Sequence, residues 1–252
     1  MLDCFSLTGK VALVTGANTG LGQGIAIALA QAGAAICLVG RTEPSETLDA
    51  INRIGGKSHV ILRDLACSDG VESVVNETHK ALGALDILVN NAGIIQRNDA
   101  LDFTAAEWDS VLDINLRSVF FLSQAAARYF VANNRGGKII NIASMLSFQG
   151  GVRVPSYTAS KSAVLGLTKA LANEWADKRI NVNAIAPGYF TTNNTAALQA
   201  DPQRSAEILT RIPAKRWGQP SDLGGAAVFL ASSAADYVHG VTLPVDGGWL
   251  AR

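Results

Sequence analysis

Tyr157 and Lys161 are the residues whose types and spacing most clearly suggest chemistry. They occur in the segment "PSYTASK", four residues apart, so a helix through this segment places a phenol and an ammonium on one face. A free tyrosine titrates near pH ~10 and a free lysine near ~10.4, so neither alone is a base at neutral pH. An ammonium beside the phenol favours the phenolate. We therefore expect Lys161 to lower the pKa of Tyr157 and to make it a general acid or base.

A glycine-rich turn near the amino terminus is the second candidate for chemistry. The segment "VALVTGANTGLGQGIAIALA" is typical of a strand, a turn and a helix, with Gly16, Gly20 and Gly22 in the turn. Glycines allow close approach of a pyrophosphate, which binds free N–H groups at the helix N-terminus. The spacing G-x-x-x-G-x-G differs from the general G-x-G-x-x-G fingerprint, and such turns also arise for steric reasons alone. The flanking strand and helix favour a nucleotide site.

The end of the second predicted strand bears on the choice between NAD and NADP. Many NAD enzymes carry an acid there that binds the ribose 2′-hydroxyl, whereas this chain has Gly40 and Arg41. Arg41 is suited to pair with a 2′-phosphate, but it is equally a solvated loop residue, and Glu43 keeps NAD possible. Asp64, at the end of the third predicted strand, binds the adenine amino group or caps a helix. The sequence leaves the 2′ group open.

The elements that must position these residues alternate between strand and helix. Short runs rich in Val, Ile and Leu are separated by longer amphipathic or Ala-rich stretches, which is typical of βαβ units around a parallel sheet. The predicted strands are 11–15, 35–40, 59–64, 86–92, 138–144, 181–188 and 241–247. The predicted helices are 21–32, 45–55, 68–82, 105–132, 157–178 and 221–233.

The domain organisation follows from the same pattern. No linker, low-complexity tract or repeat divides the 252 residues, which predicts a single domain, 1–252. The expected fold is α/β, a doubly wound, seven-stranded parallel sheet with helices on both faces. The segment 189–219 is expected to be irregular and to form a substrate lid, because ligands bind outside the carboxyl ends of the strands.

Composition excludes several kinds of partner. With 21 basic and 21 acidic side chains the formal net charge is zero, so neither nucleic acid nor an anionic membrane surface is expected as a partner. Cys4, Cys37 and Cys67 lack paired or CxxC spacing, which favours packing roles in a reducing compartment. With no leader-like or membrane-spanning stretch, we expect a soluble, cytoplasmic protein. The three histidines form no HxxxH motif and acids do not cluster, so no metal site is expected.

Six motifs in order carry a resemblance that covers essentially the whole chain: "TGANTGLG", "NNAG", "DINLRS", "NIAS", "YTASK" and "PG" at 187–188. With these motifs the chain resembles a short-chain dehydrogenase/reductase. The resemblance implies a Rossmann-like fold and hydride transfer between NAD(P) and a substrate carbon. It assigns positioning of the reacting oxygen to Ser144, proton transfer to Tyr157 and binding of the nicotinamide ribose to Lys161. It also assigns a relay water to Asn115, although a buried amide that satisfies backbone groups is the alternative.

The same resemblance implies the cofactor site. Asn91 and Gly93 would line the groove and Thr192 would hold the carboxamide. The full predicted set is Gly16, Asn18, Thr19, Gly20, Leu21, Gly22, Arg41, Asp64, Leu65, Asn91, Ala92, Gly93, Tyr157, Lys161, Pro187, Gly188 and Thr192. The family is commonly tetrameric, so a homotetramer is expected.

Within the family, "NIASMLSFQGGVRVPSYTASKS", "RSAEILTRIPAKRWG" and "VDGGWLAR" resemble the dehydrogenases of sugar acids. The substrate implied is 2-dehydro-3-deoxy-D-gluconate or its 2,5-diketo form, in the catabolism of uronates from pectin or alginate. A sugar acid needs a cation for its carboxylate and neutral donors for its hydroxyls, and Arg153 or Arg97 is expected to supply the cation. The predicted substrate residues are Ser144, Gln149, Arg153, Arg97 and Asn193. Gln96, Asn194, Arg204 and Arg216 are further donors.

Three alternatives belong to other substrates or classes. The first is another reductase of the family, acting on gluconate or on 3-oxoacyl carrier protein. The second is a non-catalytic dinucleotide sensor, which typically lacks the tyrosine or the lysine. A serine hydrolase is a distant third, because the chain has no G-x-S-x-G elbow.

Overall fold

A seven-stranded, all-parallel sheet forms the centre of the protein. The computed structural model describes residues 2–66 and 70–252. The strand order is β3-β2-β1-β4-β5-β6-β7. The strands are β1 Val11–Thr15, β2 Ala35–Gly40, β3 Ser58–Leu62, β4 Ile87–Asn90, β5 Gly137–Ile142, β6 Ile180–Pro187 and β7 Thr242–Val245. The predicted single-domain, doubly wound α/β fold is confirmed.

The winding of the sheet reverses at β1, which is paired with both β2 and β4. In the register, Val14 is opposite Leu38 on one side and Val89 on the other. A crevice opens outside the carboxyl ends of the strands at such a switch point, and this is where open α/β sheets bind ligands. The glycine-rich turn after β1 lies at this crevice.

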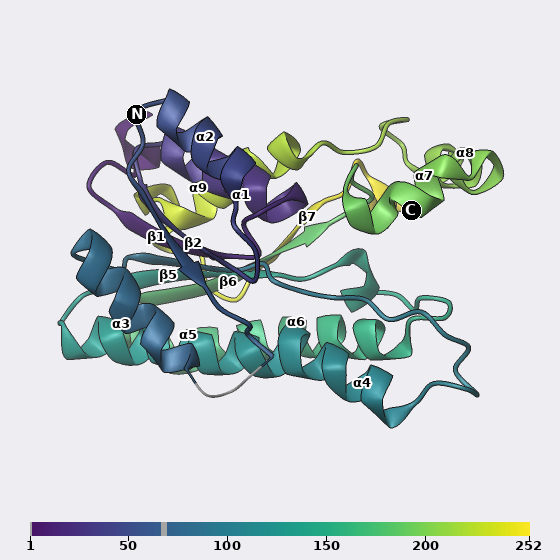
Figure 1. Cartoon of the computed structure of the whole chain (residues 1–252), viewed down its shortest axis with the longest axis horizontal. Helices are drawn as coiled ribbons and strands as arrows, with labels where there is room; N and C mark the ends of the chain where they lie inside the picture. Colours follow the sequence, from purple (N-terminus) through teal and green to yellow (C-terminus); the bar gives the residue numbers. More distant parts are fainter. Residues whose placement is uncertain (1, 67–69) are drawn as a thin grey trace.

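Helices cover both faces of the sheet (Figure 1). One face carries α1 Gly20–Gln31, α2 Ser45–Arg53 and α9 Gly224–Ala231. The other carries α3 Val71–Leu82, α4 Ala105–Leu112, α5 Ser118–Ala132 and α6 Pro155–Trp175. Short 3-10 segments are Leu2–Phe5, Met145–Ser147, Ala176–Lys178, Asn193–Thr195, Pro220–Leu223, Ser233–Ala235 and Trp249–Ala251.

Two buried apolar clusters join the helices to the sheet, one on each face. Ile25 of α1 and Ala227 of α9 pack in the cluster that contains Val14 of β1. On the other face, Leu122 of α5 packs in the cluster that contains Leu88 of β4. A fully buried leucine or isoleucine side chain stabilises the fold by about 2 kcal/mol. Because both faces of the sheet carry such side chains, helices must cover both faces for the sheet to be stable.

The predicted helix 105–132 is correct in extent but is not one continuous α-helix. Between α4 and α5 lies a π turn, Asp113–Arg117, of the kind that is frequent at functional sites. Asn115 at its centre bonds the main chain of Ile94 with both ends of its amide: Oδ1 accepts from the N–H and Nδ2 donates to the carbonyl, each at 2.9 Å. A π turn contains one residue more than an α-helical turn, and here it occurs where the Asn115 side chain binds the segment after β4.

The segment 189–219 is not irregular, so that prediction is wrong. It contains the 3-10 turn Asn193–Thr195 and two helices, α7 Ala196–Ala200 and α8 Pro202–Arg211. Asp201 caps α8 by accepting from the main-chain N–H groups of Gln203 and Arg204. Figure 1 shows α7 and α8 at one end of the molecule, beside the carboxyl terminus.

The remaining predictions about elements and composition have mixed outcomes. The helix expected at 68–82 is α3, which begins at Val71; residues 68 and 69 and Cys67 lie outside the described residues. Cys37 is a packing residue in the core, and burial raises the pKa of its thiol to about 11. Across residues 2–66 and 70–252, no helix is both long and apolar enough to span a bilayer.

Candidate active site

The turn after β1 has the shape of a phosphate cradle. Gly16 and Gly20 have φ angles of +64° and +59°, a conformation that favours glycine. A Cβ on Gly22 would collide with the Gly16 carbonyl and with Nδ2 of Asn91. The side chain of Thr19 does not cap α1, so the N–H groups of the first turn face the groove without that partner. These features fit a pyrophosphate.

Asn91 fixes the turn to the end of β4. Its Nδ2 donates to the carbonyl of Thr15 at 2.9 Å and to that of Gly16 at 3.1 Å. The Thr15 hydroxyl in turn accepts from the N–H groups of Asn91 and Ala92. The phosphate turn is therefore bonded to the neighbouring strand across the switch point, which gives the groove a fixed floor.

A groove with two connected parts crosses the carboxyl edge of the sheet. Its two parts have volumes of about 300 Å³ and about 280 Å³ and share Gly16, Asn18 and Gly93. The first part contains most of the predicted cofactor and catalytic residues and the start of the segment 189–219. The predicted residues lining it are Gly16, Asn18, Thr19, Gly20, Leu21, Gly22, Asn91, Ala92, Gly93, Ser144, Tyr157, Lys161, Pro187, Gly188, Thr192 and Asn193.

The second part of the groove contains the remaining predicted cofactor residues, Arg41, Asp64 and Leu65. Oδ1 of Asp64 accepts from the N–H of Ala66 at 3.0 Å, so this carboxylate stabilises its own turn. Arg63, which sequence reasoning missed, also lines this part and pairs with Glu77 at 2.7 Å. Arg41, which has no ion pair among the described residues, is the cation of this lining that could meet an anion.

Ser144, Tyr157 and Lys161 meet at the other end of the groove. Ser144 follows β5, while Tyr157 and Lys161 lie on the first two turns of α6, which begins with Pro155. The Ser144 side chain is near enough to the Tyr157 phenol to lower its pKa. Lys161 is 5% exposed, and its Nζ donates to the carbonyl of Ile142 at 2.6 Å and lies 5.7 Å from the centre of the Tyr157 ring.

The predicted effect of Lys161 on Tyr157 is wrong for this structure. Burial raises the pKa of the Tyr157 phenol, and the groups that oppose this are the Ser144 side chain and the positive charge of Arg97. The ammonium is engaged by a carbonyl instead of the phenol, and burial lowers the pKa of Lys161 from 10.5 to about 8. Tyr157 is therefore a neutral phenol at pH 7, which suits the donation of a proton.

Asn115 lies fully buried beneath this site. In addition to its two bonds to Ile94, its Nδ2 contacts the hydroxyl of Ser160 at 3.3 Å. The amide thus satisfies backbone groups, as the alternative interpretation of this residue requires. Its bonds hold the segment after β4 against α6, so that Ile94 lines the groove opposite Tyr157.

The predicted substrate residues do not all come together. Among the described residues, Arg153 pairs with Asp99 at 3.1 Å and lies outside the lining of the groove. Gln149 also lies outside it and accepts a hydrogen bond from Arg211 at 3.1 Å. Arg204 and Arg216 pair with Glu207 and Asp222.

Arg97 has a different environment from the other candidate arginines. Its Nη2 donates to the main-chain carbonyl of Asn194 at 3.3 Å, and its charge acts on the Tyr157 phenol. Asn193 and Asn194 line the groove, whereas Arg97, like Arg153 and Gln149, is not among its lining residues. Arg97 thus contacts the segment 189–219 and acts on Tyr157 through its charge, and no carboxylate lies within 4.0 Å of its guanidinium among residues 2–66 and 70–252.

Two serines and a threonine at this site escaped sequence reasoning. Ser147 accepts from the N–H of Ser144 and donates to the carbonyl of Lys161 at 2.6 Å, joining the two catalytic segments. Ser160 supports Asn115, and Thr195 closes the lid turn by donating to Phe190. The only feature of the sequence that could have identified these three residues is that they lie close to the predicted motifs.

The chain is similar to known proteins over nearly its whole length. A family model described as Enoyl-(Acyl carrier protein) reductase matches residues 16–250. The chain is 61% identical over 252 residues to the 2-dehydro-3-deoxy-D-gluconate 5-dehydrogenase of Escherichia coli (strain K12), covering 100% of both chains. The chain belongs to the short-chain dehydrogenase/reductase family. It is accordingly an NAD(P)-dependent oxidoreductase, as the motifs predicted.

Solved structures of the family superpose closely. A crystal structure from Agrobacterium tumefaciens with bound NADP has a TM-score of 0.94 and 58% identity, covering 99% of this chain and 100% of that one. A gluconate 5-dehydrogenase from Burkholderia cenocepacia J2315, in complex with NADP and tartrate, has a TM-score of 0.94 and 42% identity, covering 100% and 99%.

Proposed function

We propose that this member of the short-chain dehydrogenase/reductase family interconverts a ketone and an alcohol on 2-dehydro-3-deoxy-D-gluconate or its 2,5-diketo form, in uronate catabolism. The observation that carries the proposal is that Arg97, a cation without a carboxylate partner in the described part of the chain, acts on Tyr157 through its charge and donates to the Asn194 carbonyl. The printed name of the Escherichia coli relative supports the same substrate.

The cofactor would be held along the groove described above. The N–H groups at the start of α1 would bind its pyrophosphate, and Lys161 would bind the nicotinamide ribose at the far end. When bound, the nicotinamide supplies or accepts the hydride. Arg41 and Arg63 would face the ribose 2′ group, and NADP in the related crystal structures supports the use of a 2′-phosphate.

Tyr157 would transfer the proton. In the direction of ketone reduction, its neutral phenol donates to the oxygen of the substrate as that oxygen gains negative charge. Ser144, close to the phenol, would position the same oxygen. The Lys161 ammonium favours loss of the phenolic proton through its charge once the ribose hydroxyls bring it into the network. Asn115 would act through Ile94, by fixing the wall of the site.

The carboxylate of the sugar acid would pair with Arg97, and the segment 189–219 would act as the lid. Phe190, Thr192 and Asn193 of this segment line the groove. Arg97 already contacts the lid through Asn194, so binding of a carboxylate by Arg97 would be coupled to the position of the lid. A charge-assisted hydrogen bond of this kind contributes roughly 1.5–3 kcal/mol.

The proposal is tested by replacing Arg97 and comparing substrates. We expect Arg97→Met to raise KM for the diketo sugar acid by roughly tenfold to a hundredfold, because the carboxylate loses its charged partner. Arg153→Met is the matched control, since Arg153 pairs with Asp99 outside the groove, and it should leave KM unchanged. Initial rates with NADH and NADPH measure both. Equal effects of the two substitutions, or faster turnover of an acetoacetyl thioester than of any sugar acid, would contradict the proposal.

Gluconate is the second candidate substrate. The gluconate 5-dehydrogenase of Burkholderia cenocepacia has the same fold and was crystallised with tartrate, a small hydroxy acid. Gluconate has hydroxyls at carbons 2 and 3, where 2-dehydro-3-deoxy-D-gluconate has a ketone and no hydroxyl, so a site with an additional polar partner at carbon 3 would favour gluconate. The ratio of kcat/KM for the two acids decides between them.

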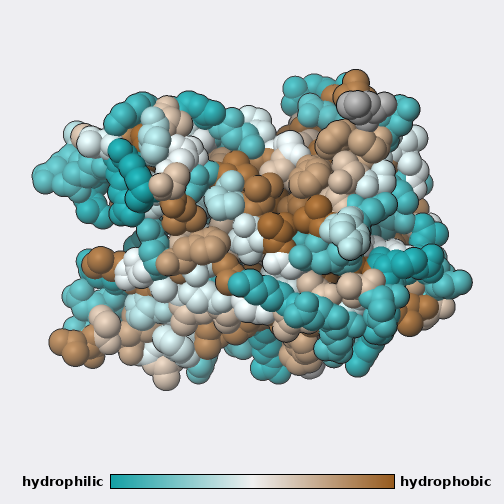
Figure 2. Space-filling model, turned by 180° about the vertical axis from the view of Figure 1, so that it is seen from behind, coloured by the Kyte–Doolittle hydropathy of each residue, from teal (hydrophilic) through white to brown (hydrophobic). Residues whose placement is uncertain are grey.

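We further propose a homotetramer in the cytoplasm. Phe121 of α5 and Trp108 of α4 are 41% and 38% exposed, and exposed aromatic side chains on neighbouring helices favour a subunit contact. Figure 2 shows apolar side chains gathered near the centre of the face that is seen there. Two apolar surfaces on one subunit would permit two kinds of subunit contact. Sedimentation at the mass of a single 26.3 kDa chain would refute the assembly.

A further inference from the structure

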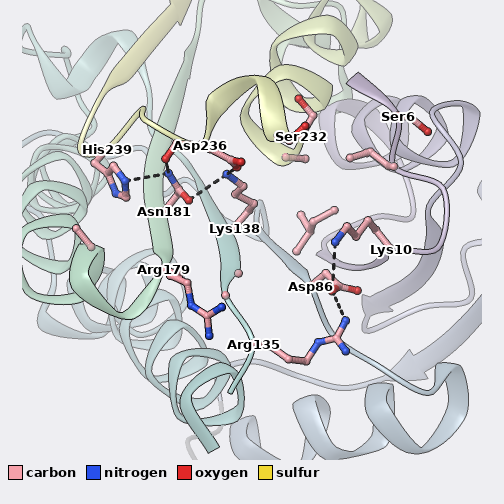
Figure 3. A pocket seen from close by; sticks show the side chains of 17 residues that line it. Ser6, Lys10, Asp86, Arg135, Lys138, Arg179, Asn181, Ser232, Asp236 and His239 are labelled. Atoms are coloured by element: carbon pink, nitrogen blue, oxygen red, sulfur yellow. Dashed lines mark hydrogen bonds and ion pairs between the residues drawn. The ribbon is translucent and has the colours of Figure 1, made fainter. Parts of the chain in front are cut away.

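A second cavity lies at the amino ends of β1, β4, β5 and β6, on the edge of the sheet opposite to the active site (Figure 3). Lys10 precedes β1, Asp86 precedes β4, and Asn181 is near the start of β6. Its volume is about 630 Å³, against about 300 Å³ for the catalytic part of the groove. This volume is in the range of small-molecule sites, and the active site makes no use of it.

Cationic side chains outnumber carboxylates around this cavity, with four Lys or Arg and two Asp in its lining. Asp86 is fully used: Oδ1 accepts from Arg135 at 2.6 Å and Oδ2 from the N–H of Val11 at 2.9 Å. Asp236 pairs with Lys138 at 2.6 Å. Each carboxylate is thus neutralised by one close cation, and two positive charges remain.

The remaining cations are Lys10 and Arg179. Nζ of Lys10 is 4.0 Å from Asp86, which Arg135 already neutralises, and the Lys10 side chain is 52% exposed. Within the part of the chain that the structure describes, the side chain of Arg179 bonds only to the two oxygens of Asn134, both from Nη2. A guanidinium has five N–H donors, so several are left over. Figure 3 shows these two side chains on opposite sides of the cavity.

Asn181 and His239 complete the lining near Lys138. Oδ1 of Asn181 accepts from Lys138, so its amide nitrogen faces the carbonyls of Ala235, Asp236 and Val238 and lies 3.1 Å from Nε2 of His239. The amide is therefore satisfied within the protein, and the charge available to a ligand comes from the two remaining cations.

We propose that this cavity binds a small dianion, of the chemical class shared by phosphate monoesters and dicarboxylates. Two uncompensated cations on opposite sides match two negative charges. Helix C-termini also favour basic residues, which accounts for Arg135 just after α5, but a helix end does not account for the hollow or for the two remaining cations. The site is separate from the phosphate turn, which lies at the other end of β1.

The experiment measures anion binding by calorimetry on the full chain saturated with NADP, so that the phosphate turn is occupied. The probes are inorganic phosphate, succinate and acetate at one ionic strength. We expect phosphate or succinate to bind with Kd of about 1 mM or tighter and acetate at least about tenfold more weakly. Phosphate alone identifies a phosphate-ester site, and succinate alone identifies a dicarboxylate site. Binding equal to that of acetate for both dianions would overturn the proposal.

Substitutions locate the binding. Arg179→Gln and Lys10→Gln should each weaken the dianion by about tenfold, and Lys10 is half exposed, so the second variant removes a charge without disturbing the core. Arg128→Gln is the control: Arg128 pairs with Glu72 on α3, away from the cavity, and its loss should leave Kd unchanged. Unaltered affinity in both cavity variants would place the anion elsewhere and refute the site. The readout is independent of turnover, so it does not depend on the proposed substrate.

Discussion

Lys161 is a buried ammonium whose cost to the fold can be measured. Burial lowers its pKa from the ordinary value of 10.5 to about 8. The unfolded chain therefore binds more protons than the folded chain between pH ~8 and ~10.5, and stability attributable to Lys161 rises with pH in this window. Below pH ~8 the lysine is charged in both states and the folded protein carries the full cost. Above ~10.5 it is neutral in both states and the cost is absent.

The magnitude follows from the two pKa values. A difference of about 2.5 between them, at ~1.4 kcal/mol for each, corresponds to about 3 kcal/mol. We expect the unfolding free energy of the wild type minus that of Lys161→Met to increase by this amount between pH ~7 and ~10.5. Subtraction of the variant removes the titration of every other group from the comparison. Urea unfolding at several pH values, at one protomer concentration and without cofactor, measures it.

Two observations would separate this reasoning from its alternatives. Lys80→Met, at an exposed position of α3, serves as the control for the loss of a lysine as such. A wild-type minus Lys161→Met difference that is flat from pH ~7 to ~10.5 would refute the burial of a charged ammonium at this position. The variant also loses the bond to the Ile142 carbonyl, which shifts the whole curve by a constant and leaves its slope unchanged.

Two other substitutions test the groove. Tyr157→Phe should lower kcat by about a thousandfold, because the proton donor is lost, and should change the Kd of NADPH by less than about threefold; a kcat within tenfold of the wild type would remove the proton-transfer role. Arg41→Ala should raise KM for NADPH by about tenfold and leave that for NADH unchanged, because only NADPH has a 2′-phosphate; equal changes would show that Arg41 does not contact it. Steady-state kinetics of each variant measures how its rate depends on the cofactor and on the substrate.

Local pattern predicted most of the elements. Strands β1 and β2 have the expected bounds, and the other strands differ by one or two residues at each end, because neighbouring strands and not local composition decide where pairing stops. The segment 189–219 was predicted to be irregular, yet it contains α7 and α8. α8 depends on the cap by Asp201 and on the contact of Ile208 with Trp249, which is distant in sequence.

Charge partners were the least predictable part of the site. Arg97 and Arg153 are equally close in sequence to catalytic elements, yet Arg153 is held by Asp99 and Arg97 reaches the lid. Which carboxylate lies within 4 Å of an arginine depends on how loops from different strands are brought together. Sequence spacing contains no information about such contacts between segments.

The sequence by itself determined the sheet, the phosphate turn and the pairing of Tyr157 with Lys161 on one helix face, because each depends on residues within one or two turns of one another or on the alternation of apolar runs. Only the tertiary structure decided the partners and the protonation states of the ionisable groups. It directs the Lys161 ammonium to the Ile142 carbonyl, leaves Tyr157 a neutral phenol beside Ser144, and gathers Lys10, Arg179 and His239 around a cavity at the far edge of the sheet. Burial and neighbouring charges set these properties, and both come from segments that only the fold brings into contact.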